Sequence, residues 1–170
     1  MNEALISLGS NIDKEINLPA AIARLAAQPG LTVLAVSTVL ETAAVGADGR
    51  PADQPAYHNA ALRARTTLSL SELQALLRTI EAEMGRVRGA DKFAPRPIDL
   101  DLAYYGDPHL AVTNGGSEQP GGSEQPLDGD ALRHAHIALP LAEVAPDWVH
   151  PQTGATLAAL AAAFRVEQAA

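Results

Sequence analysis

Apolar and polar positions change their spacing several times along the first 105 residues, and each change predicts a new element. Ala4–Leu8 is a short apolar run that ends at Gly9, which predicts a buried strand. Apolar residues then recur at helical spacing, which predicts a helix with Asn17 as its N-cap and an end at Pro29-Gly30. Residues 31–42 are rich in Val, Leu and Thr and predict a long strand.

The second half of the pattern repeats this order after an irregular stretch. Residues 43–56 lack periodicity and predict a loop, and Tyr57–Thr67 predicts a second long strand. Ser69 and Glu72 form a capping box at the start of a helix over 70–84, which Gly85 ends. A loop over 86–97 and a strand over 98–105 complete the series.

The element order is therefore β-α-β-β-α-β, which predicts an α+β fold of the ferredoxin-like type. We expect one domain over residues 1–170, with an antiparallel sheet and both helices on one face. Apolar positions in 139–144 and 156–164 predict a small helical C-terminal extension, which Trp148 would seal onto the body.

Residues 113–130 interrupt the domain with a tandem repeat of Gly-Gly-Ser-Glu-Gln-Pro. Such a composition offers nothing to bury, so we expect a flexible insertion or spacer.

Composition narrows the classes of function. The net charge of −8 argues against a general nucleic-acid binder, although positive charge gathers between Arg86 and Arg96. The absence of cysteine excludes a disulfide framework and fits a reducing cytoplasm. No signal-peptide pattern opens the chain, and no apolar run approaches the roughly 20 residues of a membrane helix. We expect a cytoplasmic monomer that acts on small molecules, without a membrane or nucleic-acid partner.

The strand over 98–105 carries candidate chemistry. Side chains alternate along a strand, so Ile98, Leu100 and Leu102 share one face, and Asp99 and Asp101 share the other with Cα atoms about 6.6 Å apart. Paired carboxylates repel each other unless a cation lies between them, and Mg²⁺ is commonly held by one or two carboxylates and substrate phosphates. The upstream loop adds cations that can neutralise a polyphosphate, namely Arg86, Arg88, Lys92 and Arg96.

The stretch from Phe93 to Leu102, FAPRPIDLDL, resembles the signature of the 6-hydroxymethyl-7,8-dihydropterin pyrophosphokinase family. Gly85–Arg88 and Leu8–Asn11 resemble the same family, as does the later stretch Leu139–Pro146. The resemblance covers most of residues 4–106 before it returns at 139. It implies transfer of pyrophosphate from ATP to the hydroxymethyl group of the pterin in folate biosynthesis, which gives AMP and the pterin pyrophosphate.

The resemblance also implies roles for residues around the nucleotide. Asp99 and Asp101 would hold Mg²⁺, as two ions, and would act in catalysis together with Arg86 and Arg96. ATP is the expected co-substrate, contacted by Glu81, Arg88, Lys92, Phe93 and Leu102. A second group of residues would bind the pterin, comprising Thr42, Val45, Tyr57, Asn59 and His136. Asn59 can donate and accept hydrogen bonds at once, which suits the edge of a pyrimidinone-like ring.

Residues 127–136 depart from the family pattern. The family has a Pro-His-Pro-like stretch, then a basic residue and a stacking Phe, where this chain has Asp128, His134 and His136. A His ring can still stack, but it is less apolar and can be protonated. His134 and His136 also suggest a metal site, but no third ligand accompanies them.

Other interpretations stay open at this point. Phe93 could anchor its loop in the core, and Glu81 could belong to a solvated helix face. The departures in 127–136 favour a weak or inactive paralogue that binds pterin or nucleotide. An RNA-binding module on the same fold is disfavoured by the few aromatic residues on the strands and by the acidic net charge.

Overall fold

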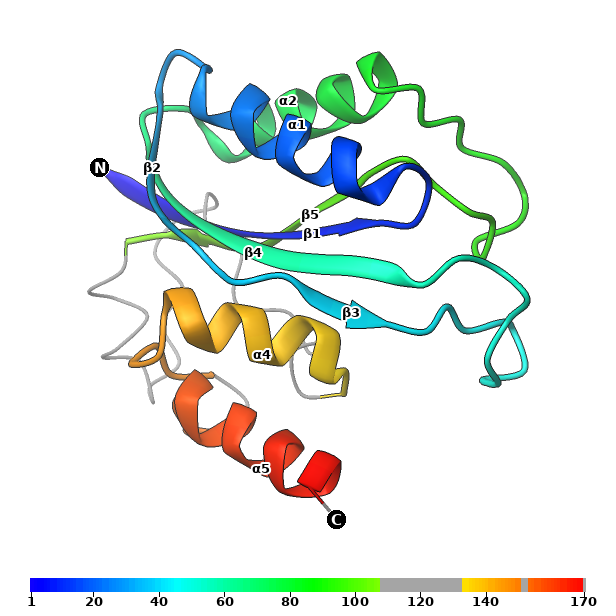
Figure 1. Cartoon of the computed structure of the whole chain (residues 1–170). Coiled ribbons are helices and arrows are strands. Elements are labelled where there is room, and N and C mark those ends of the chain that lie inside the picture. Colours follow the sequence, from blue (N-terminus) through cyan, green and yellow to red (C-terminus); the bar gives the residue numbers. More distant parts are fainter. Residues whose placement is uncertain (108–132, 151–152, 170) are drawn as a thin grey trace.

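One antiparallel sheet runs through the centre of the molecule, in the order β2-β4-β1-β5, with β3 also paired to β4 (Figure 1). The computed structural model describes residues 1–107, 133–150 and 153–169. The strands are β1 (Asn2–Ser10), β2 (Leu31–Val36), β3 (Leu40–Thr42), β4 (Tyr57–Thr66) and β5 (Asp99–Gly106). The helices are α1 (Lys14–Ala26), α2 (Leu70–Glu83), α4 (Ala135–Val144) and α5 (Leu157–Ala169). The predicted α+β fold of the ferredoxin-like type is confirmed.

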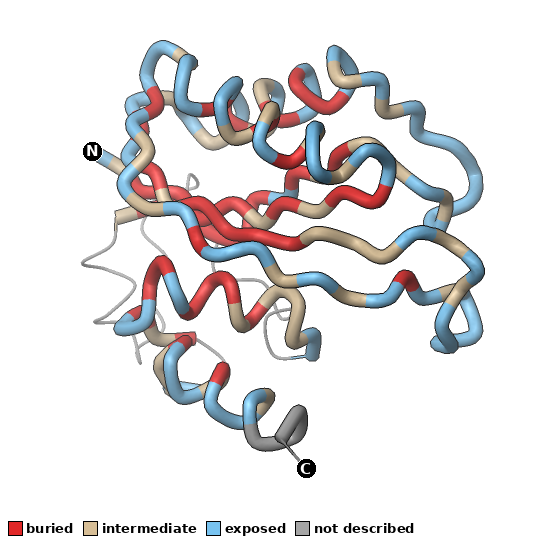
Figure 2. Tube along the Cα trace, in the orientation of Figure 1, coloured by how far each residue is buried: buried red, intermediate tan, exposed pale blue. Residues whose placement is uncertain are grey.

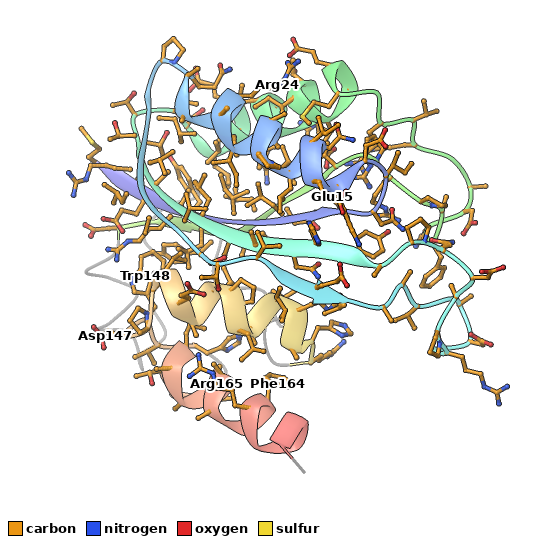
Figure 3. All side chains as sticks on the ribbon, in the orientation of Figure 1. Glu15, Arg24, Asp147, Trp148, Phe164 and Arg165 are labelled. Carbon is orange, nitrogen blue, oxygen red and sulfur yellow. The ribbon has the colours of Figure 1, made fainter. Side chains whose placement is uncertain are left out.

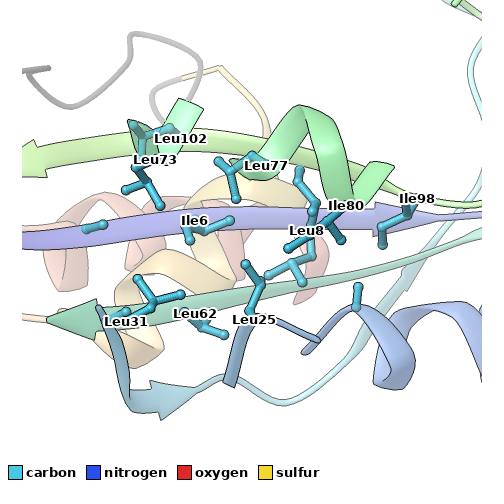
Figure 4. Packing of buried hydrophobic residues seen from close by; sticks show 14 of the residues in the cluster. Ile6, Leu8, Leu25, Leu31, Leu62, Leu73, Leu77, Ile80, Ile98 and Leu102 are labelled. Carbon is cyan, nitrogen blue, oxygen red and sulfur yellow. The ribbon is translucent and has the colours of Figure 1, made fainter. Parts of the chain in front are cut away.

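Both faces of the sheet are covered. Helices α1 and α2 lie on one face, and α4 and α5 lie on the other (Figure 1). The core under α1 and α2 includes Ile6, Leu8, Leu62, Leu77 and Ile80, which pack together in Figure 4. The C-terminal extension thus forms a second layer, and the central strands are buried on both sides (Figure 2).

Strand β5 shows the predicted alternation only as far as Leu102. Leu100 and Leu102 belong to the core under α1 and α2, whereas Ala103 and Tyr104 both belong to the core under α4. The register between β1 and β5 shifts between Leu5 and Ile6, because one extra residue enters β5. Such a bulge changes the phase of a strand, so that β5 contributes to both cores.

Helix α1 begins earlier than predicted. Its N-cap is Asp13 and not Asn17, and Asn17 already donates its backbone N–H to the Asp13 carbonyl at 2.8 Å. The Asn17 side chain bonds to the carbonyl of Ile12 at 2.7 Å. Pro19 therefore lies inside the helix.

The predicted long strand over 31–42 is broken into β2 and β3. The Ser37 hydroxyl accepts a hydrogen bond from the backbone N–H of Ala61 at 2.8 Å, so a side chain takes the place of a backbone carbonyl here. Thr38 then turns toward α4, where its N–H and hydroxyl both donate to the Glu143 carboxylate at 2.9 Å. These side-chain bonds interrupt the strand.

The second core, which lies between the sheet and helices α4 and α5, is stabilised by Trp148. This residue is buried (Figure 3). Its ring meets Tyr104 of β5 edge-on, with centroids 4.5 Å apart. The guanidinium of Arg63 from β4 lies 5.5 Å from the Trp148 ring centroid and donates from Nε to buried Glu3 at 2.8 Å. The prediction that Trp148 seals the extension is confirmed.

The repeat over 113–130 lies outside the described residues, so its role as a spacer stays a prediction. Among the helices that the structure describes, none has the length and apolar character needed to cross a membrane.

Truncation of Trp148 tests the second core. Trp148→Ala is expected to lower the free energy of unfolding by about 3–5 kcal/mol, the usual loss for a large buried aromatic side chain. Urea unfolding followed by circular dichroism measures it, with Trp148→Phe as the conservative control that retains much of the contact. A loss below about 1 kcal/mol for Trp148→Ala would contradict the proposed fastening.

Candidate active site

A buried carboxylate organises the free edge of β5. Glu81 is the last buried residue of α2 and is only 2% exposed. Its Oε1 accepts a hydrogen bond from the backbone N–H of Leu100 at 2.8 Å. Because β5 is an edge strand, no neighbouring strand supplies an acceptor for this N–H. Buried carboxylates require such partners, because an unpaired one is costly to desolvate. The open alternative that Glu81 belongs to a solvated helix face is therefore wrong.

Glu81 also holds two arginines of the loop over 86–97. Nη1 of Arg86 donates to Oε1 at 2.7 Å, and Nη2 of Arg88 donates to Oε2 at 2.7 Å. The Arg86 side chain is only 11% exposed, whereas that of Arg88 is 63% exposed. Burial lowers the pKa of Arg86, but the nearby carboxylates of Asp99, Glu81 and Asp101 outweigh it, so the guanidinium stays charged.

Asp99 lies at the start of β5 between two guanidinium groups. Arg86 contacts its Oδ1, and Nη1 of Arg96 donates to its Oδ2 at 2.9 Å. Asp101 is different, because it has no ion-pair partner among the described residues. The structure therefore brings the predicted Asp99, Asp101, Arg86 and Arg96 together at one end of β5.

The sheet register places the predicted metal and pterin residues in one row. Gly9 of β1 pairs with Asp99 of β5 on one side and with Asn59 of β4 on the other. Paired residues of adjacent strands project to the same face, so Asp99 and Asn59 stand two strand spacings apart, roughly 10 Å. Gly9 carries no side chain and leaves this space open, since a Cβ there would lie 3.6 Å from Asn59 Oδ1 and 3.8 Å from the Tyr57 ring.

A pocket of about 610 Å³ curves around the edge of β5, a volume typical of small-molecule sites. The residues that line it include Arg88, Asp101, Leu102 and Ile137 of α4. Leu102 also belongs to the core under α1 and α2. Helix α2 contributes Gln74 and Arg78, two polar residues that the sequence analysis did not single out.

The charge state of Asp101 indicates a place for a cation. Desolvation by the atoms packed around the carboxyl group, together with the nearby charges of Asp99 and Glu81, raises its pKa to about 6 against the opposing charges of Arg86 and Arg88. The residue as a whole remains exposed at the pocket wall, so a ligand can reach it. A bound cation would relieve this repulsion between carboxylates.

The donor set fits Mg²⁺. Asp99 and Asp101 offer hard oxygen ligands from one face of a strand, and Mg²⁺ is commonly bound by one or two carboxylates plus phosphates. The described part of the chain contains no cluster of three or more His, Cys, Asp or Glu residues that could hold a metal alone. His134 and His136, with ring centroids 5.3 Å apart, therefore have no third ligand among those residues.

Three of the residues predicted to bind the pterin, Thr42, Tyr57 and Asn59, lie at the other end of the row. Asn59 is 4% exposed and donates from Nδ2 to the Leu40 carbonyl at 3.1 Å and to Thr42 Oγ1 at 2.8 Å. These bonds fix the amide and orient its Oδ1 side toward Gly9. Burial raises the pKa of the Tyr57 hydroxyl, on which the charges of Arg96 and Asp99 act in opposite directions.

The two loops beside the site are joined by a residue that sequence reasoning missed. Gln54 donates from Nε2 to the Phe93 carbonyl at 2.9 Å and accepts from Asn11 Nδ2 at 3.4 Å. Asn11 Oδ1 in turn accepts the backbone N–H of Arg96 at 2.8 Å. Polar bridges between loops have no periodic signal, although the Leu8–Asn11 motif already marked one of their ends.

The remaining predicted residues occupy exposed or half-buried positions in the two loops and in α4. Val45 is 49% exposed and Phe93 is 44% exposed, so the alternative that Phe93 anchors its loop in the core is wrong. Lys92 is exposed, and its carbonyl accepts from Arg96 Nη2. His136 lies half-buried in the first turn of α4. The binding roles of these residues stay predictions, and Asp128 lies outside the described residues.

Comparison with known proteins identifies relatives of the chain. Residues 5–146 match the family described as 7,8-dihydro-6-hydroxymethylpterin-pyrophosphokinase. A 2-amino-4-hydroxy-6-hydroxymethyldihydropteridine pyrophosphokinase from Synechocystis is 37% identical over 91% of this chain and 72% of its own length. A protein of the same name from Methylorubrum extorquens is 38% identical over 88% of this chain and 86% of its own length. A mitochondrial folate synthesis bifunctional protein from Arabidopsis thaliana is 42% identical over 62% of this chain and 18% of its own length.

The raised pKa of Asp101 predicts a pH-dependent stability effect in metal-free buffer. The charged carboxylate is disfavoured in the folded state, so stability declines as the pH rises from the unfolded pKa of about 4 through the folded pKa of about 6. Asp101→Asn is therefore expected to melt at a higher temperature than the wild type at pH 8 and at the same temperature near pH 4. Scanning calorimetry with EDTA measures this, with exposed Asp53→Asn as the control for net charge. Equal melting temperatures at pH 8 would contradict the prediction.

Proposed function

Because the chain belongs to the 7,8-dihydro-6-hydroxymethylpterin-pyrophosphokinase family, we propose that it transfers pyrophosphate from ATP to 6-hydroxymethyl-7,8-dihydropterin in folate synthesis. The observation that carries the proposal is the row in which Asp99 faces Asn59 across Gly9, with Asp101 and the arginines beside it. One end of this row suits polyphosphate and the other suits a flat polar ring.

In the proposed step the hydroxymethyl oxygen of the pterin attacks the β-phosphorus of ATP. The bond from that phosphorus to the oxygen that bridges it to the α-phosphate breaks, AMP leaves with the electron pair, and the hydroxyl proton is lost to solvent or a carboxylate. Phosphoryl-type transfers depend on positioning and charge neutralisation more than on covalent catalysis.

The side chains around β5 supply these two effects. Asp99 and Asp101 would hold Mg²⁺, as two ions, which when bound neutralise phosphate oxygens and lower the barrier to attack. Arg86, Arg88 and Arg96 present guanidinium groups that can pair with phosphate oxygens. Glu81 holds Arg86 and Arg88 in place, so less conformational entropy is lost when they bind the nucleotide.

The pterin would occupy the open floor over Gly9. Asn59 would read the ring edge with its amide, and Tyr57 would pack against the ring. Thr42 fixes the Asn59 amide, and Val45 and Phe93 offer exposed apolar surface that can cover a ligand. His136 would supply the opposing ring from α4, and Lys92 would add positive charge on the nucleotide side.

We further propose a cytoplasmic monomer that acts on small molecules and not on nucleic acid. The acidic net charge and the lack of cysteine support this setting.

Formation of AMP from ATP and Mg²⁺, with and without 6-hydroxymethyl-7,8-dihydropterin, tests the function. Pterin-dependent AMP is the expected result. ATP binding without AMP formation would instead favour a catalytically weak paralogue, for which the His residues at 134 and 136 are the supporting observation.

The carboxylates are tested in the same assay. Asp99→Asn and Asp101→Asn are each expected to lower kcat by at least about a hundredfold, because they remove a metal ligand that acts on developing charge. Asp53→Asn, an exposed loop substitution, is the matched control. Near wild-type kcat in either site variant would contradict the two-carboxylate metal site.

His136→Phe tests the ring contributed by α4. A more apolar ring at this position is expected to tighten pterin binding by about two- to tenfold, the range of an aromatic stacking gain. Calorimetric titration with the pterin measures it, and affinity for an ATP analogue serves as the internal control. Unchanged pterin affinity would place His136 outside the pterin site.

A further inference from the structure

The two oxygens of Asp99 are both occupied by guanidinium groups of the protein itself. Arg86 takes Oδ1, and Arg96 takes Oδ2 at 2.9 Å. Hydrogen bonds between charged partners are among the stronger ones in proteins, and the Asp99 side chain is only 24% exposed. A divalent cation that approaches Asp99 therefore meets two competing cations, whereas Asp101 has no ion-pair partner in the described part of the chain.

Each competing arginine has a second anchor that does not involve Asp99. Arg86 remains bonded to Glu81 Oε1 at 2.7 Å and to the Ile98 carbonyl at 3.4 Å. Arg96 donates from Nε to the Ala94 carbonyl at 3.3 Å and from Nη2 to the Lys92 carbonyl. Both side chains can therefore give up Asp99 while they stay at the site.

We propose that Arg86 and Arg96 serve as resting counter-ions of Asp99 and are exchanged for the metal when metal and nucleotide bind. One divalent cation carries the same charge as the two guanidinium groups, so the positive charge in direct contact with Asp99 is unchanged by the exchange. The released guanidinium groups then face the polyphosphate, held near it by Glu81 and by the loop carbonyls. This inference rests on the magnesium site proposed above.

The exchange predicts changes in affinity that differ from those caused by a disordered site. Removal of Arg86 or Arg96 takes away a competitor for Asp99, and so affinity for the metal alone increases. Affinity for the metal–nucleotide complex decreases, because a phosphate partner is lost. A variant whose site was merely disordered would bind both more weakly.

Mn²⁺ binding to the nucleotide-free protein, followed by electron paramagnetic resonance, tests this proposal. Arg86→Met and Arg96→Met retain much of the apolar stem and are expected to bind Mn²⁺ about tenfold more tightly than the wild type, the change that corresponds to one charge-assisted hydrogen bond. Arg88→Met is the matched control, because Arg88 pairs with Glu81 and not with Asp99. It is expected to change the affinity by only about twofold, the effect of one lost charge that contacts neither Asp99 nor Asp101.

A second titration uses the Mg²⁺ complex of α,β-methylene-ATP. In this analogue a methylene group replaces the oxygen that bridges the α- and β-phosphates, so the proposed reaction cannot occur. Arg86→Met and Arg96→Met are expected to bind it at least about tenfold more weakly than the wild type. Thermal unfolding establishes which variants are folded, and Arg96→Met alone suffices if Arg86→Met is not.

The outcomes separate this proposal from the one on which it rests. If Asp99→Asn weakens Mn²⁺ binding but the arginine variants bind Mn²⁺ no more tightly than Arg88→Met, the exchange is overturned and the metal site stands. If neither the wild type nor any variant binds Mn²⁺, the metal site and the exchange are both overturned. Tighter Mn²⁺ binding together with weaker nucleotide binding supports the exchange.

Discussion

The buried carboxylate of Glu81 is the contact on which the site depends. A strand at the edge of a sheet leaves backbone groups unpaired, and Glu81 satisfies one of them at Leu100 from the neighbouring helix. The same two oxygens bind Arg86 and Arg88. One side chain therefore both satisfies the edge of the sheet and positions two positive charges. Helix α2, which contributes to the core, thus also positions the loop over 86–97.

Strand β1 connects the two halves of the site. It pairs with β4 and with β5, so its register fixes how far Asn59 lies from Asp99. The turn that follows it reaches the loop over 86–97, because the Ser10 hydroxyl donates to the Pro97 carbonyl at 2.6 Å and Asn11 accepts from Arg96. The order of the sheet, and not proximity in sequence, assembles residues that are 40 positions apart.

Periodic features were predictable from the sequence, and isolated polar contacts were not. Alternation in Ile98–Leu102 separated the core face from the carboxylate face, and the Ser69 and Glu72 capping box formed as predicted. The start of α1 was misplaced because Asn17 bonds backward to Ile12 and does not cap the helix. Gln54 could not be assigned, since its partners Asn11 and Phe93 are distant in sequence. The resemblance indicated the site residues, but no pattern in the sequence indicates that Asp99 pairs with two arginines.

The chain contains a single tryptophan, and it lies in the core between β5, α4 and α5. Its indole is enclosed by Tyr104 and Arg63, away from the row that joins Asp99 to Asn59. Intrinsic fluorescence excited at the indole band therefore reports on one layer of the molecule. The fluorescence of Trp148 thus indicates whether the C-terminal helices are packed on the sheet. Detachment of that layer can be observed separately from unfolding of the layer formed by α1 and α2.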